Sequence, residues 1–258
     1  MNKSAARSPS LSRPLVGTLS LLAVVALLTT TGCAAWRIRQ SADLARQSEP
    51  FQAAPAQAAA TLLVVGDSTG VGTGASSPAH SVAGLISAAH PRLTVVNRAV
   101  DGAKFADMAR QLQGDERFDV ILILGGGNDV IRLTGQEQLE SDIAVVAQRA
   151  RERGQLVVMM PAGNVGNAPF FYPPVSWLMA QRSRTLHASV RQAAADNGAL
   201  YVNLYKERAQ DPFAQRPREL NAKDGLHPSD AGYRVWLSEL EAQAGLSSRL
   251  ATLERRGS

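Results

Sequence analysis

The chain has 258 residues, of which 45% are hydrophobic, 19% charged and 5% aromatic. These values suit one globular domain with appendages, and they exclude collagen-like, coiled-coil and polytopic membrane proteins. The single cysteine, Cys33, excludes an intrachain disulfide and a cysteine-based zinc cluster.

The net charge of +5 is concentrated at the N-terminus. Residues 1–32 contain Lys3, Arg7 and Arg13 and no acidic residue, which leaves 24 basic and 22 acidic residues in the remainder. So small an excess of positive charge does not favour nucleic-acid binding, and we expect no nucleic-acid partner.

Residues 1–32 are predicted to be a signal peptide or a signal anchor. The three basic residues precede 15–28, an apolar run interrupted only by Thr18 and Ser20, which is typical of a secretory signal. Positive charge ahead of the run favours a cytoplasmic N-terminus and an exported body.

The segment Thr30-Thr31-Gly32-Cys33 follows the apolar run. It resembles a bacterial lipobox, in which a cysteine after small residues is lipidated and becomes the mature N-terminus, although Thr30 stands where that motif prefers leucine. An uncleaved signal anchor and ordinary cleavage remain open. All three alternatives place the body outside the cytoplasm. Lipidation at Cys33 or an anchor would attach it to a membrane, at the periplasmic or extracellular face.

Three further segments complete the predicted organisation. Residues 33–60 are rich in Ala, Gln, Ser and Pro and have too little apolar content for a core, so we predict a flexible tether, with a short helix over 36–47 as an option. Residues 61–246 form the one predicted domain. Residues 247–258 are predicted to be a polar C-terminal tail.

Strands and helices alternate along the domain. Short, continuous apolar runs predict buried strands at 61–65, 93–97, 120–124, 156–160 and 199–203. Helical patterns lie near 81–89, 104–112, 137–153, 177–197 and 229–245. The alternation predicts an α/β fold, with a five-stranded parallel sheet in a three-layer α/β/α sandwich. We expect Arg149, Arg151 and Arg153, at one helix end, to form a solvated face.

Ligands of such sheets bind outside the carboxyl ends of the strands, so we expect the functional residues in the segments that follow the strands. Gly66-Asp67-Ser68 follows the first strand, Gly102 lies after the second, and Gly126-Gly127-Asn128-Asp129 follows the third. Asp224-Gly225-Leu226-His227 lies near the C-terminus. Taken singly, each is common loop sequence.

Together, and in this order, the four segments resemble the blocks of the SGNH (GDSL) hydrolase family. The resemblance spans about 61–240 and implies that family's flavodoxin-like fold. Thr69 departs from the leucine in the family's name, at a position without a chemical role. The glycine-rich stretch after Ser68 lacks the Lys-Ser/Thr of a phosphate-binding loop, so we reject nucleotide binding. No cofactor and no metal site is expected.

The resemblance implies a role for each polar residue. Ser68 is the expected nucleophile, and because a serine hydroxyl is weakly nucleophilic it needs a base, for which His227 is the candidate. Asp224 would hold the tautomer of His227 and stabilise the imidazolium. The expected oxyanion hole comprises the backbone N–H groups of Ser68 and Gly102 and the side-chain amide of Asn128.

The remaining titratable candidates are interpreted as structural. His90 and His187 fall at a helix end and in mid-helix, and His80 lies in a loop that could reach the rim of the site. Asp67 and Asp129 are expected to stabilise turns rather than to transfer protons.

The residues that would contact the substrate are predicted from their aromatic character. The segment 163–174 is the most aromatic part of the chain, with Phe170, Phe171 and Tyr172 in succession. These rings either pack on the domain or form a wall that contacts the acyl group. We expect an open site for small or single-chain acyl groups.

The predicted function is that of an exported serine esterase. It would hydrolyse carboxylic esters or thioesters of a small-molecule acyl substrate through an acyl-enzyme, in the style of compact bacterial esterases, thioesterases and lysophospholipases. One alternative is an O-acyltransferase that uses the same residues on envelope carbohydrate. The other is a non-catalytic envelope-binding module. The sequence does not indicate the oligomeric state, the acyl length or the alcohol.

Overall fold

The computed structural model describes residue 32 and residues 35–256. The predicted targeting segment up to Thr31, and Cys33 with its expected lipidation, therefore lie outside the described residues. Within the described part of the chain, no helix is both long and apolar enough to cross a membrane.

A five-stranded parallel sheet forms the centre of the molecule. Its strands are β1 (Ala60–Gly66), β2 (Leu93–Asn97), β3 (Phe118–Gly125), β4 (Gly154–Pro161) and β5 (Leu200–Tyr201). Their order in the sheet is β2-β1-β3-β4-β5, which is the flavodoxin-like order. The predicted fold class is confirmed. The fifth strand is shorter than predicted, because only Leu200 and Tyr201 pair with β4.

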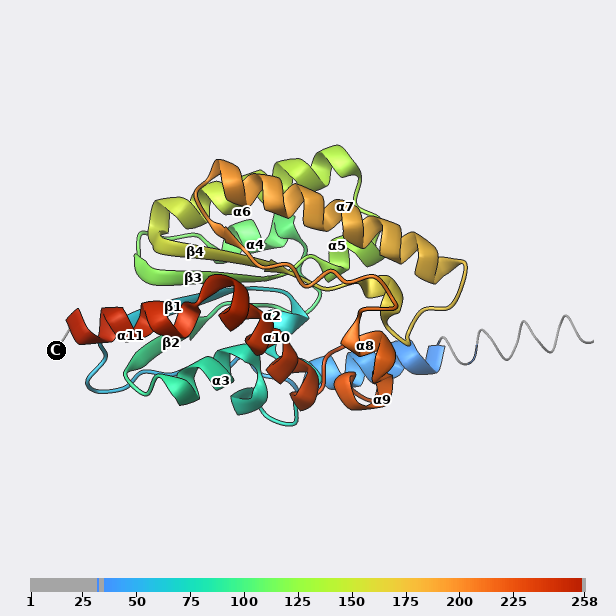
Figure 1. Ribbon diagram of the computed structural model, residues 1–258, viewed down its shortest axis with the longest axis horizontal. Coiled ribbons are helices and arrows are strands. Elements are labelled where there is room, and N and C mark those ends of the chain that lie inside the picture. The colour runs from blue at the N-terminus through green and yellow to red at the C-terminus, as the bar shows by residue number, and fades with distance from the viewer. Residues whose placement is uncertain (1–31, 33–34, 257–258) are drawn as a thin grey trace, which may run out of the picture.

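Helices cover both faces of the sheet (Figure 1). One face carries α4 (Phe105–Gln111), α6 (Gln136–Arg153) and α7 (Val175–Asp196), and the other carries α3 (Val82–Ala89), α10 (Asp230–Ala244) and α11 (Leu246–Arg256). Short helices complete the connections: α2 (Ser68–Val71), η1 (Pro78–His80), α5 (Gly127–Ile131), η2 (Val165–Asn167), α8 (Pro212–Gln215) and α9 (Pro217–Leu220).

Strand β1 shows why the strands are continuously apolar. Leu63 and Val65 belong to the core on the α6 side, whereas Leu62 and Val64 belong to the core on the α10 side. All four side chains are buried. Because successive side chains of a strand point to opposite faces, a sheet covered on both faces needs apolar residues at every position.

The C-terminal residues form a packed helix, contrary to the predicted polar tail. Leu246 and Leu250 of α11 are fully buried, and Leu253 packs against the same core. Their spacing of four and three residues places them on one face of the helix. The other positions are mostly polar, so the average composition of the segment indicated a polar tail.

The predicted solvated face at the end of α6 is wrong for Arg153. This side chain is buried and donates hydrogen bonds to the carbonyl oxygens of Leu112 (2.5 Å), Gln113 (2.9 Å) and Glu116 (2.9 Å). Arg149 also reaches a carbonyl, that of Ala109, at 2.6 Å. Carbonyl groups at the end of α4 and in the following loop therefore take the place of water around these guanidinium groups.

The described part of the predicted tether lies against the domain. Residues 35–47 form a helix, called here the N-terminal helix. After it, Ala53 forms an antiparallel bridge with Val95 of β2, and the side chain of Gln52 exchanges two hydrogen bonds with the backbone of Asn97. This part of the segment is therefore packed on the domain and is not the predicted flexible tether. Hydrogen bonds rather than apolar side chains hold it, and a low apolar content does not reveal such bonds.

Candidate active site

Ser68 lies at the point where β1 ends and α2 begins. Asp67 caps this helix: its carboxylate accepts hydrogen bonds from the backbone N–H (2.9 Å) and the hydroxyl (2.8 Å) of Thr69. These bonds hold the tight turn that presents Ser68 at the carboxyl edge of the sheet. The neighbours of β1 are β2 and β3, so Ser68 lies at the topological switch point of the sheet.

His227 and Asp224 come from the loop between α9 and α10. A hydrogen bond of 2.8 Å from Ala222 N–H to the His227 carbonyl closes the loop. His227 Nδ1 lies 2.6 Å from Asp224 Oδ2, and His227 Nε2 lies 3.0 Å from Ser68 Oγ. Because the carboxylate only accepts, Nδ1 carries the proton and Nε2 accepts from the Ser68 hydroxyl. The three side chains thus form one hydrogen-bonded chain.

The carboxylate of Asp224 is 2% exposed and well supplied with donors. Its Oδ1 accepts from the backbone N–H groups of Leu226 (3.0 Å) and His227 (3.1 Å). Burial raises the pKa of this carboxyl, but the hydrogen bonds and the charge of the His227 imidazolium outweigh burial and lower the pKa below its ordinary value. Asp224 is therefore an anion at neutral pH.

Three predicted oxyanion donors come from three different strand ends to the same cavity, which is lined by Ser68, Gly102 and Asn128. Gly102 has a φ of +76°, and a Cβ there would lie 3.1 Å from the Arg132 guanidinium, so glycine suits the position. Asn128 Nδ2 donates one hydrogen bond to the Ala103 carbonyl (3.2 Å), which leaves its second N–H for a ligand.

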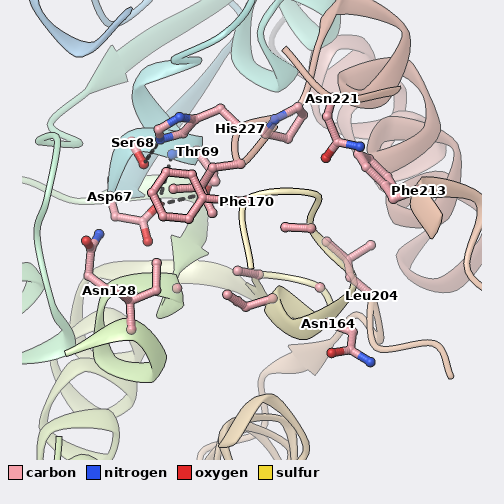
Figure 2. A pocket seen from close by; sticks show the side chains of 18 of the residues that line it. Asp67, Ser68, Thr69, Asn128, Asn164, Phe170, Leu204, Phe213, Asn221 and His227 are labelled. Atoms are coloured by element: carbon pink, nitrogen blue, oxygen red, sulfur yellow. Dashed lines mark hydrogen bonds between the residues drawn. The ribbon is translucent and has the colours of Figure 1, made fainter. Parts of the chain in front are cut away.

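The cavity beside Ser68 has a volume of about 430 Å³. Figure 2 shows Ser68, His227 and Asn128 at one side of it, with Leu204 and Phe213 across the space from them. Much of its remaining wall is apolar: Ile131, Val165, Phe170, Leu226 and Trp236 also line it. A polar cluster thus faces an apolar space of the size that small-molecule ligands occupy.

Only one of the three predicted substrate-contacting rings lies in this cavity. Phe170 lines it, and its backbone N–H donates to the Gly225 carbonyl at 2.9 Å, next to the loop of His227. Phe171 packs edge-on against Phe170 and against the core. Tyr172 is exposed and accepts a hydrogen bond from Arg37. The prediction is therefore wrong for Phe171 and Tyr172, because consecutive loop residues point in different directions.

The other histidines lie away from the cavity lining. His80 contacts Ser76 and Asp230 on an exposed loop, and His90 pairs with Glu254. His187 is buried in α7, with Nε2 2.8 Å from the Ala162 carbonyl and Nδ1 2.6 Å from the Tyr201 hydroxyl.

Asp129 is buried and stabilises the turn after β3. It accepts hydrogen bonds from Phe105 N–H and the Thr134 hydroxyl, each at 3.0 Å. Burial raises the pKa of Asp129, and likewise that of Asp67. Both carboxyls therefore have the turn-stabilising contacts expected of them.

Several lining residues were missed by sequence reasoning. Asp101 accepts a hydrogen bond from the Thr73 hydroxyl (2.6 Å), and burial raises its pKa. Arg132 lies beside Gly102, and Phe213 and Trp236 form part of the far wall. The N-terminal helix also contributes lining residues. Asp101 could have been found from the sequence, because it lies in the segment after the second strand and directly precedes Gly102. The other lining residues had no local sequence signal.

Among residues 35–256, no group of three or more His, Cys, Asp or Glu side chains is arranged to hold a metal ion.

The model of the GDSL-like lipase/acylhydrolase family matches residues 64–235. The comparison with curated proteins gave no match. Among solved structures, LAE5, an alpha/beta hydrolase from the metagenome of Lake Arreo, Spain, has a TM-score of 0.58 at 23% identity, covering 73% of this chain and 96% of that chain. TesA has a TM-score of 0.58 at 22% identity, covering 72% and 99%.

A third structure, Axe2, an acetylxylan esterase from Geobacillus stearothermophilus, has a TM-score of 0.51 at 21% identity, covering 73% and 95%. At these identities the structural likenesses show the shared fold, while the family model matches most of the chain. The protein accordingly belongs to the GDSL-like lipase/acylhydrolase family and is a carboxylic ester hydrolase.

Proposed function

We propose that this protein hydrolyses esters or thioesters that carry one acyl chain, through an acyl-enzyme on Ser68, and that it acts at the outer face of a membrane. The observation that carries the catalytic part is the continuous hydrogen-bonded chain Asp224–His227–Ser68, which ends in the same cavity as Gly102 and Asn128.

The reaction begins at the Ser68 hydroxyl. Oγ attacks the substrate carbonyl carbon while its proton passes to His227 Nε2, and Asp224 stabilises the resulting imidazolium. The carbonyl oxygen becomes an oxyanion, which accepts hydrogen bonds from the N–H groups of Ser68 and Gly102 and the amide of Asn128. Among the described residues, no protein acceptor is bonded to either backbone N–H, so both are free for this purpose.

The second half of the reaction releases the acid. The tetrahedral intermediate expels the alcohol or thiol, which takes the proton from His227, and an ester to Ser68 remains. Water then gives a proton to Nε2 as it attacks this ester, and expulsion of Ser68 Oγ regenerates the hydroxyl with that proton. The apolar wall formed by Leu204, Phe213 and Trp236 suits the hydrocarbon part of the acyl group.

The test is covalent labelling of the full-length protein with a fluorophosphonate, combined with a p-nitrophenyl ester series. We expect labelling at Ser68, and Ser68→Ala should abolish both labelling and hydrolysis. Ser248→Ala, at an exposed position of α11, is the matched control and should retain both. Labelling that persists in Ser68→Ala, or that maps to another serine, would refute the assignment.

Attachment to a membrane is the second part of the proposal. It is supported by the apolar run 15–28, by Cys33 five residues after the end of that run, and by the three basic residues ahead of it. A diacylated cysteine would anchor the chain stably, since two acyl chains bury far more methylene groups than one.

Intact-mass spectrometry of the membrane fraction tests the attachment. We expect a chain that begins at Cys33 with added acyl mass, and Cys33→Ser should retain the leader. An unmodified chain that begins near Met1 would instead indicate a signal anchor. A soluble chain that begins after Ala35 would contradict membrane attachment.

A further inference from the structure

The N-terminal helix (residues 35–47) forms one wall of the active-site cavity, although it precedes the residues that the family model matches. Four of its side chains line the cavity beside Ser68: Ile38, Ser41, Ala42 and Ala45. Their spacing of three, one and three residues places them on one face of the helix. The face that meets the cavity is therefore narrow and built mostly of small side chains.

The start of this helix is tied to the loop that carries Phe170. The Arg37 guanidinium donates to the Phe170 carbonyl at 3.0 Å and to the Tyr172 hydroxyl at 2.6 Å, and it also bonds the Pro169 carbonyl. Its central carbon lies 4.8 Å from the centre of the Tyr172 ring, which adds a cation–π contact. Phe170, in the same loop, lines the cavity, so these contacts tie the N-terminal helix to a second part of the cavity wall.

The segment after the helix is held to the sheet. Phe51 packs against the core on the α10 side, and Ala53 and Val95 exchange backbone hydrogen bonds of 3.1 and 2.8 Å. Gln52 bonds Asn97 with both ends of its amide, at 2.7 and 2.9 Å. With both ends fixed, the helix keeps a defined position over the cavity.

We propose that the N-terminal helix determines acyl-chain specificity, and that Ala42 and Ala45 leave the room that a single medium-length or long acyl chain occupies. The idea rests on the proposed function, because it places the acyl group in this cavity. Alanine presents only a methyl group, so the wall recedes at these two positions, while Phe213 and Trp236 supply apolar surface elsewhere in the cavity. A larger side chain at either position would fill the space that the chain needs.

The experiment compares Ala42→Trp with Arg39→Trp in the full-length protein. Arg39 is exposed on the same helix and does not line the cavity, so its variant adds the same ring outside. For Ala42→Trp, we expect the ratio of kcat/KM for p-nitrophenyl decanoate to that for p-nitrophenyl acetate to fall by about 10-fold or more. Arg39→Trp should leave the ratio unchanged. Ala45→Leu, a smaller change in the same wall, should shift it in the same direction as Ala42→Trp.

A binding measurement separates this inference from the proposed function. Decanoic acid should bind the wild type in isothermal titration calorimetry, and Ala42→Trp should weaken it by about 10-fold. If esters are hydrolysed through Ser68 but Ala42→Trp keeps the wild-type chain-length profile, the wall has no role in specificity. If decanoic acid binding depends on Ala42 but Ser68 is neither labelled by the fluorophosphonate nor needed for hydrolysis, the role of the N-terminal helix in acyl binding is supported and the catalytic assignment is wrong. Failure of the wild type to bind decanoic acid would overturn the inference.

Discussion

Two buried histidines of this protein have opposite environments. His227 lies between the Asp224 carboxylate and the Ser68 hydroxyl, and it faces a cavity. His187 lies between the Ala162 carbonyl and the Tyr201 hydroxyl, inside α7. Both rings use both nitrogens, so hydrogen bonding alone does not distinguish them.

The two histidines differ in the group that would stabilise a positively charged ring. An imidazolium at position 227 would have a carboxylate at 2.6 Å to stabilise it. An imidazolium at position 187 would have only the neutral Ala162 carbonyl and the Tyr201 hydroxyl as partners, and burial lowers the pKa of His187 to about 4. One histidine is therefore built to become charged during a reaction, and the other is built to remain neutral.

The sharpest test of this comparison removes each ring in turn. His227→Ala should reduce kcat/KM for p-nitrophenyl esters by about 10⁴–10⁶-fold, because Ser68 loses its base. The buried Asp224 carboxylate would lose one hydrogen-bond donor, so urea unfolding should show a lower free energy of unfolding while circular dichroism stays native. His187→Gln should retain the activity of its folded fraction. Comparable loss of activity in both variants, with intact circular dichroism, would remove the distinction.

A second change tests the carboxylate alone. Asp224→Asn should lower kcat by about 10⁴-fold. The amide can donate to Nδ1, which would leave the proton on Nε2 and deprive the Ser68 hydroxyl of its acceptor. Steady-state kinetics at neutral pH measure the effect. A loss below about 10-fold would mean that Asp224 does not hold the tautomer.

A third change leaves the proton path intact. Asn128→Ala should lower kcat by about 10²–10³-fold while KM is largely kept, because the amide is needed only when the oxyanion forms. The Ser68 hydroxyl should still be labelled by a fluorophosphonate, although more slowly. An increase in KM with unchanged kcat would instead indicate a role in ground-state binding.

The smallest effect concerns stability and His187. Its pKa is about 4 in the folded protein and about 6.5 when unfolded, so the unfolded chain binds more protons between these values. The contribution is fully present above pH 6.5 and is lost as pH falls toward 4, by up to about 3 kcal/mol. Urea unfolding at pH 7 and 4.5 should show a smaller loss in His187→Gln than in wild type. Equal losses would refute the assignment.

The chemistry was predictable from the sequence to the extent that residue type and position after a strand specify it. Ser68, Gly102 and Asn128 follow three strands whose apolar runs are plain, and parallel strands bring their carboxyl ends to one edge. His227 was identifiable only by its spacing from Asp224 and by the family resemblance, since no strand ends close before it.

Side-chain direction and backbone pairing were not predictable. Phe170 and Tyr172 are equally aromatic, yet only the first lines the cavity. Arg153 ends a helix where cations are ordinarily solvated, but carbonyl groups surround it. The N-terminal helix presents Ala42 and Ala45 to the site, and a stripe of such small residues carries little signal of burial.

The contacts of the segment after the N-terminal helix bear on how the sheet meets other chains. Strand β2 is an edge strand, and an exposed edge invites pairing with another molecule. Here Leu93, Val95 and Asn97 each have their N–H taken, by His90, Ala53 and the Gln52 amide respectively. The opposite edge, β5, has only two residues. A chain that lost residues 48–56 would expose the N–H groups of Val95 and Asn97, whereas Leu93 would keep its bond to His90. We expect such a chain to self-associate through that edge.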